Sequence, residues 1–159
     1  AVLEVSYKKE NIEKKAYAIN DVIVSRNSIR SMITVDAYVE SEKIDSYFGD
    51  GIILSTPTGS TAYNLSANGP ILYPFLNAFV LTPICPHSLH KRPLVLPKEF
   101  EVVLKADDSA IVILDGQDEI VLNANDKLKV KISSLKANMV HRSEKNYFKI
   151  LNNKLNWGN

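Results

Sequence analysis

Apolar and polar positions alternate with a period of two along most of the chain. In the run 2–7, for example, Leu3, Val5 and Tyr7 share one face. Such alternation predicts strands that bury one face and expose the other. In the last run, 127–132, the apolar residues alternate with three lysines, so we expect that strand to face the core on one side and water on the other. The predicted strands are 2–7, 17–25, 32–39, 51–55, 79–81, 94–96, 100–105, 110–114, 119–122 and 127–132.

Two segments show helical patterns instead. The first, 60–67, follows a hydroxyl-rich turn in which Thr58 or Ser60 is the expected cap, and Asn68-Gly69-Pro70 ends it. The second, 146–155, has an apolar stripe at helical spacing and is expected to pack back on the sheets. Many short strands with few helices predict a mainly β fold of two packed sheets, resembling a sandwich, with one short helix after the turn and one carboxy-terminal helix. We interpret residues 1–159 as a single domain.

The composition is that of a globular protein, with 45% hydrophobic and 23% charged residues among 159. A formal net charge of +1 gives no basic surface for nucleic acid and no polybasic arm for a membrane. The single cysteine, Cys85, has no internal partner for a disulfide, which favours a reducing compartment. No apolar run approaches the ~20 residues that span a bilayer. We therefore expect a cytoplasmic protein without nucleic-acid or membrane partners.

A segment rich in Gly, Ser and Thr, 50–70, is the candidate small-molecule site. A buried strand turns sharply at Thr56-Pro57 and leads into the first helix. The first backbone N–H groups of a helix are free and suit carbonyl, phosphate or purine acceptors. Gly59 would allow a close approach, and Thr58, Ser60 and Thr61 would add directional contacts. The structural alternative is that these hydroxyl groups only cap the helix.

Other kinds of site fit the sequence less well. The turn lacks the Gly-Lys-Ser/Thr ending of a phosphate-binding P-loop and the Gly-x-Gly-x-x-Gly of a dinucleotide fingerprint. A hydrolase triad of Ser60, His87 and Asp50 can be written, but Ser60 lacks the Gly-x-Ser-x-Gly elbow. His, Cys and carboxylates show no metal-ligand spacing, so we expect no metal site in this chain.

Two long blocks of the sequence resemble the NAD kinase family. They are GDGIILSTPTGSTAYNLSANGP at 49–70 and LTPICPHSLHKRPLVLP at 81–97. In the matching order, Asn20-Asp21 precedes them, Asp115-Gly116-Gln117 follows, and YFKILNNKLNWG at 147–158 is similar to the last helix of the family. The resemblance covers nearly the whole chain.

The resemblance implies an enzyme that transfers a phosphoryl group from ATP, or from polyphosphate in some members, to the 2′-hydroxyl of the adenosine ribose of NAD, giving NADP. Mg²⁺ or another divalent metal would accompany ATP. In the family, an amino-terminal α/β domain carries the catalytic Asp on a Gly-Gly-Asp-Gly loop, which residues 1–159 lack. The chain therefore resembles the carboxy-terminal domain alone. We expect it to be the NAD-binding and oligomerising half, inactive by itself, within a homodimer or homotetramer.

The same resemblance implies the residues that contact NAD. Asn20 and Thr61 would bond the adenine or its ribose, and Asp21 would accept ribose hydroxyls, directly or through water. Asp50 would face the nicotinamide ribose, in a site that a neighbouring subunit would complete, whereas Phe48 replaces a basic or imidazole residue found in many members. The full predicted set is Asn20, Asp21, Asp50, Thr58, Thr61, Ala62, Tyr63, Asn64, Leu65, Ser66 and Gln117.

Several of these residues also have a structural explanation: a strand start for Asn20, a turn for Asp50 and Gln117, or core packing for Tyr63 and Leu65. Two other functions stay open at this point. One is a binding module that senses NAD or NADP without turnover. The other is a lipid kinase of the related superfamily, although polar groups suited to adenine favour NAD.

Overall fold

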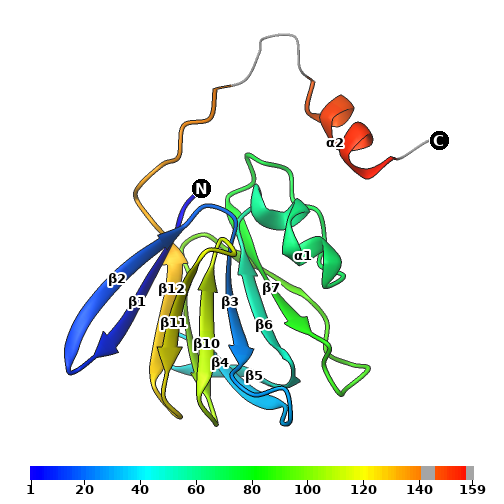
Figure 1. Cartoon of the computed structure of the whole chain (residues 1–159). Helices are drawn as coiled ribbons and strands as arrows, with labels where there is room; N and C mark the ends of the chain where they lie inside the picture. The colour runs from blue at the N-terminus through cyan, green and yellow to red at the C-terminus, as the bar shows by residue number, and fades with distance from the viewer. Residues whose placement is uncertain (141–145, 157–159) are drawn as a thin grey trace.

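Two six-stranded antiparallel sheets make up the body of the protein (Figure 1). The computed structural model describes residues 1–140 and 146–156. In the first sheet the order is β2 (Ile12–Ala18), β1 (Leu3–Lys9), β12 (Lys127–Ile132), β9 (Glu101–Ala106), β4 (Ile33–Val39) and β5 (Glu42–Gly49). In the second sheet it is β11 (Asp118–Leu122), β10 (Ala110–Leu114), β3 (Asp21–Arg26), β6 (Gly51–Ser55), β7 (Ala78–Ile84) and β8 (Leu94–Pro97). The predicted mainly β fold of two packed sheets is confirmed.

The main core lies between the two sheets. It joins inward-facing residues of both sheets, among them Leu3 and Val35 from the first sheet and Leu54 from the second. The central strand β6 is buried along its whole length. Its Ile53 points away from the main core and packs with Ile23 and Ile84 in a second, smaller cluster. The second sheet is therefore apolar on part of its outer face as well.

The structure contains two strands, β2 and β5, that the sequence did not predict. Each forms a hairpin with the strand before it through two residues of positive φ, Glu10-Asn11 in one case and Glu40-Ser41 in the other. A two-residue hairpin turn of type I′ needs positive φ at both positions, and Asn-Gly or Asp-Gly is its usual sequence. Since neither turn carries Gly, the usual signal for a hairpin is missing from both.

The single strand predicted at 17–25 is wrong, because the chain changes sheet within it. β2 ends at Ala18 in the first sheet and β3 begins at Asp21 in the second. Between them the backbone N–H groups of Ile19, Asn20 and Asp21 all donate to the Asp115 carboxylate. The N–H groups that would continue a ladder are used by this side chain, so the strand is interrupted.

The helix after the turn is shorter and differently capped than predicted. A 3₁₀ turn, Gly59–Thr61, is followed by α1, Tyr63–Ser66. Thr58 stands at the cap position but makes no side-chain capping bond. Thr56 takes this role instead, because its Oγ1 accepts from the Gly59 N–H at 3.0 Å.

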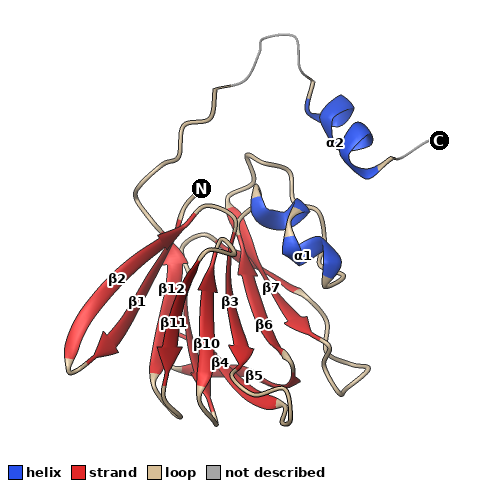
Figure 2. Ribbon diagram, in the orientation of Figure 1, coloured by secondary structure: helices blue, strands red, loops and turns tan. Residues whose placement is uncertain are grey.

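The carboxy-terminal helix α2, Tyr147–Leu155, forms as predicted, with the Asn146 side chain accepting from the Phe148 N–H at its start. Its expected packing on the sheets is wrong. Figure 2 shows α2 apart from both sheets, above α1. The ring of Tyr147 in α2 packs against the ring of Tyr73, which lies in the loop after α1, with 5.1 Å between the ring centroids. The last two letters of the predicted block, Trp157 and Gly158, lie outside the described residues. Neither described helix is long and apolar enough to cross a membrane.

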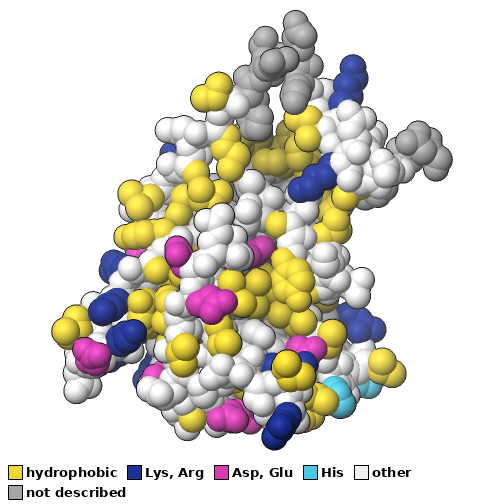
Figure 3. Space-filling view, viewed as in Figure 1, with side chains coloured by type: hydrophobic (Ala, Val, Ile, Leu, Met, Phe, Trp, Pro, Cys, Tyr) yellow, Lys and Arg dark blue, Asp and Glu magenta, His cyan; other side chains and the backbone are white. Residues whose placement is uncertain are grey.

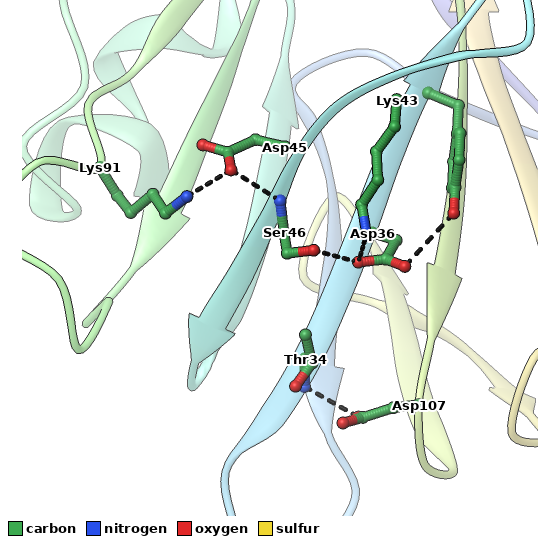
Figure 4. Close-up of polar contacts among 8 residues, drawn as sticks. Thr34, Asp36, Lys43, Asp45, Ser46, Lys91 and Asp107 are labelled. Carbon is green, nitrogen blue, oxygen red and sulfur yellow. Dashed lines mark hydrogen bonds and ion pairs between the residues drawn. The ribbon is translucent and has the colours of Figure 1, made fainter.

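A polar network on β4 and β5 connects the edge of the first sheet to the loop after β7 (Figure 4). Asp36 accepts from Ser46 Oγ at 2.5 Å and pairs with Lys43 at 2.9 Å. The neighbouring Asp45 pairs with Lys91 of the loop. Lys91, a basic residue within the second resemblance block, is therefore held at β5 by its ion pair with Asp45.

Candidate nucleotide site

A cavity of about 590 Å³ lies on the outer face of the second sheet. Its apolar part comes from Ile23, Ile84 and Ile113, which belong to the small outer cluster or pack against it. In Figure 3, hydrophobic side chains gather on this face over β10, β3 and β6, with acidic side chains beside them. The volume suits a small molecule, and apolar walls combined with polar groups that can fix a ligand's orientation are usual for such sites. The lining residues are Asn20, Asp21, Ile23, Ser25, Arg26, Asp50, Ala62, Tyr63, Ile84, Ile113, Asp115, Gly116 and Glu119.

At one end of the cavity, the segment before β3 lies directly against the turn after β6. The Thr56 N–H donates to the Asn20 carbonyl at 2.9 Å, and Thr56 Oγ1 donates to the Ile19 carbonyl at 2.7 Å. A Cβ on Gly59 would lie 2.0 Å from the Asn20 oxygen. Only glycine therefore fits at position 59, and the close approach brings Asn20 beside the start of α1.

Asp115, in the turn between β10 and β11, holds the same segment from the other side. Its Oδ2 accepts from the Ile19 N–H at 2.7 Å, and its Oδ1 accepts from the N–H groups of Asn20 at 2.7 Å and Asp21 at 3.1 Å. The Asp115 N–H in turn donates to the Asp21 carbonyl at 3.1 Å. Hydrogen bonds to an ionised carboxylate are stronger than neutral ones. The position of the Asn20-Asp21 pair is thus fixed before any ligand binds.

Asp21 is a buried carboxyl group at the cavity wall, with 3% of the residue exposed. Burial, and to a smaller extent the neighbouring Asp115 carboxylate, raise the pKa of Asp21 to about 6, while a hydrogen bond from the Tyr63 N–H acts in the opposite direction. Near neutral pH Asp21 is mainly an ionised acceptor. A carboxylate in this position is suited to the hydroxyl groups of a sugar.

At the other end of the cavity, Arg26 and Asp50 form an ion pair, with 2.8 Å between Arg26 Nε and Asp50 Oδ1. The Asp50 carbonyl also accepts from the Arg26 N–H at 3.1 Å and from Ser25 Oγ at 3.4 Å. Both side chains are partly exposed. The end of β3 therefore sets the position of Asp50.

The structure brings part of the predicted site together. Asn20 and Asp21, at the start of β3, line the same cavity as Asp50, before β6, and Ala62 and Tyr63, at the start of α1. These residues come from three separate stretches of sequence. Tyr63 is 46% exposed, so its ring is available to a ligand.

The other predicted residues do not line this cavity. They are Thr58, Thr61, Asn64, Leu65, Ser66 and Gln117. Thr61 Oγ1 accepts from Lys154 Nζ of α2 at 3.0 Å, and Gln117 is exposed in the turn after Asp115. Binding roles for these residues stay predictions.

Asn64 has an internal structural role. It is fully buried. Its Nδ2 donates to the carbonyls of Ser60 at 3.0 Å and Pro70 at 3.1 Å, and its Oδ1 accepts from Thr82 Oγ1 at 2.7 Å. The amide therefore ties α1 to the following loop and to β7.

Several lining residues were not predicted as site residues. Asp115 had a signal, because it opens the Asp-Gly-Gln block of the resemblance. Arg26 and Glu119 had none, since isolated charged residues in strands are usually only solvated. Ile23 and Ile113 lie in continuous apolar runs that indicate burial but do not distinguish core from a ligand surface.

The hydrolase alternative does not fit the geometry. The Ser60 hydroxyl is buried, donates to the Pro57 carbonyl at 2.6 Å and accepts from the Leu72 N–H at 2.9 Å. His87 instead contacts the Phe48 ring, at 5.4 Å between ring centroids. Within residues 1–140 and 146–156, no group of three or more His, Cys, Asp or Glu residues is arranged to hold a metal ion.

Comparison with known proteins shows the family to which the chain belongs. Residues 19–142 match the model of the ATP-NAD kinase C-terminal domain. The NAD kinase of Sulfurimonas denitrificans is 46% identical over 159 residues, which are 99% of this chain and 56% of that protein. An NAD kinase of Campylobacter jejuni, strain RM1221, is 47% identical over 148 residues, 93% of this chain and 51% of that protein. The chain thus spans about half the length of these relatives.

Solved structures show the same similarity in three dimensions. Yeast NADH kinase in complex with NADH superposes with a TM-score of 0.88 at 28% identity, over 99% of this chain and 49% of that one. An NAD kinase from Archaeoglobus fulgidus in complex with ATP gives a TM-score of 0.81 at 28% identity, over 98% of this chain and 60% of that one. The two-sheet fold is that of the carboxy-terminal domains of NAD kinases. The chain belongs to the ATP-NAD kinase C-terminal domain family.

Proposed function

We propose that this chain is the NAD-binding half of an NAD kinase, which transfers a phosphoryl group from ATP to the 2′-hydroxyl of the adenosine ribose of NAD. The observation that carries the proposal is the open cavity where Asn20 and Asp21 meet Ala62 and Tyr63. These residues come from two of the segments that resemble the family. Their meeting around a cavity of ligand size is expected if these segments form a binding site.

The adenosine half of NAD would bind at the Asn20-Asp21 end. The Asn20 amide both donates and accepts, as an adenine edge requires, and the Asp21 carboxylate accepts the ribose hydroxyl groups. The exposed Tyr63 ring offers a face for stacking. Asp50 would contact the nicotinamide ribose. Thr58, Thr61, Asn64, Leu65, Ser66 and Gln117 are proposed to support this binding.

The phosphoryl transfer itself would need parts that the described residues do not provide. We propose that a further domain supplies the catalytic carboxylate, the ATP site and the ligands of a divalent metal. The metal would neutralise developing charge on the transferred phosphoryl group. Such catalysis depends mostly on positioning and charge stabilisation, so residues 1–159 alone would bind NAD without turnover. A cytoplasmic homodimer or homotetramer is the proposed assembly.

The direct test is an assay for NADP formation by the whole enzyme and by residues 1–159 alone, each with NAD, ATP and Mg²⁺. The proposal predicts product from the whole enzyme and only NAD binding, measured by calorimetry, from the shorter chain. Phosphorylation of a lipid with no reaction on NAD would contradict it. Binding of NAD by a whole protein that never forms NADP would favour the alternative of a nucleotide sensor.

A further inference from the structure

Aromatic contacts hold the carboxy-terminal helix α2 beside the segment that follows α1. The Tyr147 ring lies edge-on to the Tyr73 ring, and the Phe148 ring lies 6.2 Å from the same ring, measured between centroids. Edge-to-face arrangements are favourable for aromatic rings. Leu151, one turn further along α2, is buried. These contacts fix the position of α2 relative to α1.

One side chain of α2 extends from this position to the turn before α1. Lys154 lies in the last turn of α2, and its Nζ donates to Thr61 Oγ1 at 3.0 Å. Thr61 ends the 3₁₀ turn and directly precedes Ala62 and Tyr63, which line the cavity. The contact joins two residues that are 93 positions apart in the sequence. Lys154 therefore connects the last helix to the edge of the candidate site.

This contact determines how the Thr61 hydroxyl group can bond a ligand. A hydroxyl has one proton to donate and two lone pairs that accept, whereas an ammonium group only donates. Lys154 thus occupies a lone pair of Thr61 Oγ1, and the hydroxyl proton points away from Lys154. The contact also restricts rotation of the Thr61 side chain, which is half-buried. In this state the hydroxyl presents a donor, which suits the ring nitrogen and oxygen acceptors of adenosine.

We propose that Lys154 is a positioning residue of the nucleotide site: by donating to Thr61 Oγ1, it orients the Thr61 hydroxyl as a hydrogen-bond donor to the adenosine half of the ligand. This inference rests on the proposed function, in which Thr61 supports NAD binding. It goes beyond that function because it gives the last helix a part in the site. Lys154 acts through Thr61 and does not need to touch the ligand.

The test is a double-variant cycle, in which calorimetry measures the NAD dissociation constant of the purified whole enzyme. Lys154→Met keeps the apolar stem and removes the donor. It should weaken NAD binding by about threefold to tenfold, as the loss of one hydrogen bond does. Thr61→Val should weaken binding to at least the same extent. In the Thr61→Val background, Lys154→Met should change the affinity by less than about twofold, because the hydroxyl through which it acts is missing.

Two controls separate this role from a purely structural one. Lys149→Met removes another exposed ammonium group from α2 and should change the affinity by less than about twofold. Lys154→Arg still donates and should retain most of the affinity. The melting temperature of Lys154→Met should match that of Lys149→Met, because the aromatic contacts of α2 remain.

Three results would overturn this inference alone. The first is wild-type NAD affinity in Lys154→Met. The second is an equal loss in the Thr61→Val background, which would show that Lys154 does not act through the hydroxyl. The third is a lowered melting temperature together with weakened binding that Lys154→Arg does not rescue, which would make the role structural. A wild-type enzyme that binds no NAD would overturn the proposed function and this inference together.

Discussion

The two polar ends of the cavity are built by different means. At the Asn20-Asp21 end, the Asp115 carboxylate holds three backbone N–H groups, and Asp21 is almost completely buried. At the other end, Arg26 and Asp50 form a side-chain ion pair that water reaches. At the first end a side chain holds the backbone in place, whereas at the second end two side chains hold each other.

This difference indicates how binding energy and selectivity are divided. A buried end that is ordered before binding loses little entropy when the ligand arrives, so it is suited to supply affinity. A partly exposed ion pair contributes little to stability, and its effect is mainly on which charges are tolerated nearby. We therefore expect substitutions at the first end to cost folding and affinity together, and those at the second end to change selectivity.

The largest effect is expected from Asp115→Ala, because it leaves three backbone donors without their acceptor. The free energy of unfolding should fall by about 3 kcal/mol in urea denaturation, and NAD binding should be lost. Asp118→Ala, an exposed position on β11, is the matched control and should change stability by less than about 0.5 kcal/mol. Equal effects of the two substitutions would show that Asp115 is only a surface residue.

The next effect concerns pH and Asp21. Its pKa in the folded protein is about 6, above the ordinary 3.8, so ionisation of Asp21 opposes folding. Its contribution to stability is complete below about pH 4 and is lost as the pH rises through about 6. Relative to Asp21→Asn, the wild type should therefore lose about 2 kcal/mol of unfolding free energy between pH 4 and 7. If the unfolding free energies of the two proteins changed in parallel with pH, the raised pKa of Asp21 would be contradicted.

Ionisation of Asp21, which lowers stability, should strengthen ligand binding. Asp21 becomes a pure acceptor as the pH rises through about 6. NAD affinity of the wild type should increase over this range, and that of Asp21→Asn should not. Calorimetry at pH 5 and pH 7.5 measures both.

A stability effect of similar size is expected from Gly59→Ala, which tests the contact between the two segments at the first end. The added Cβ would lie 2.0 Å from the Asn20 oxygen, so the segments must separate, at a cost of about 2 kcal/mol in unfolding free energy. Gly116→Ala meets no atom within 4 Å but has a φ of +70°, and should cost about 1 kcal/mol from backbone strain alone. An undisturbed NAD affinity in Gly59→Ala would argue against the need for this contact.

The smallest effect is expected at Tyr63, whose ring is exposed and whose loss leaves the core intact. Tyr63→Ala should weaken NAD binding by about tenfold, corresponding to about 1.4 kcal/mol of lost contact with an aromatic ring. The melting temperature should stay nearly unchanged. Tyr63→Phe keeps the ring and should retain the affinity; a loss in this control would point to the hydroxyl group instead of stacking.

The sequence predicted the fold where strands alternate clearly and failed where local signals were missing. Lys127–Ile132 was recognised because apolar residues and lysines alternate along it. β2 was missed because it is an edge strand, with Ile12 60% exposed, and follows a turn without Gly. The break before Asp21 could not be predicted, since it depends on Asp115, 94 residues further along the chain.

The candidate site shows the same limit. Asn20, Asp21, Ala62 and Tyr63 were predicted by resemblance, and the structure places them around one cavity. The Arg26–Asp50 pair could not be found in this way, because it depends on the register in which β3 pairs with β6. Long-range pairing decides which charges meet, and a single sequence does not reveal it.

The proposed function places the adenosine half of NAD between the Asn20-Asp21 segment and the start of α1. The most direct test is a crystal structure of the protein with NAD. We expect adenine against Asn20 and Tyr63, with the ribose hydroxyl groups at Asp21. A dinucleotide bound elsewhere, or lying in the cavity in the reverse direction with nicotinamide at Asp21, would contradict it.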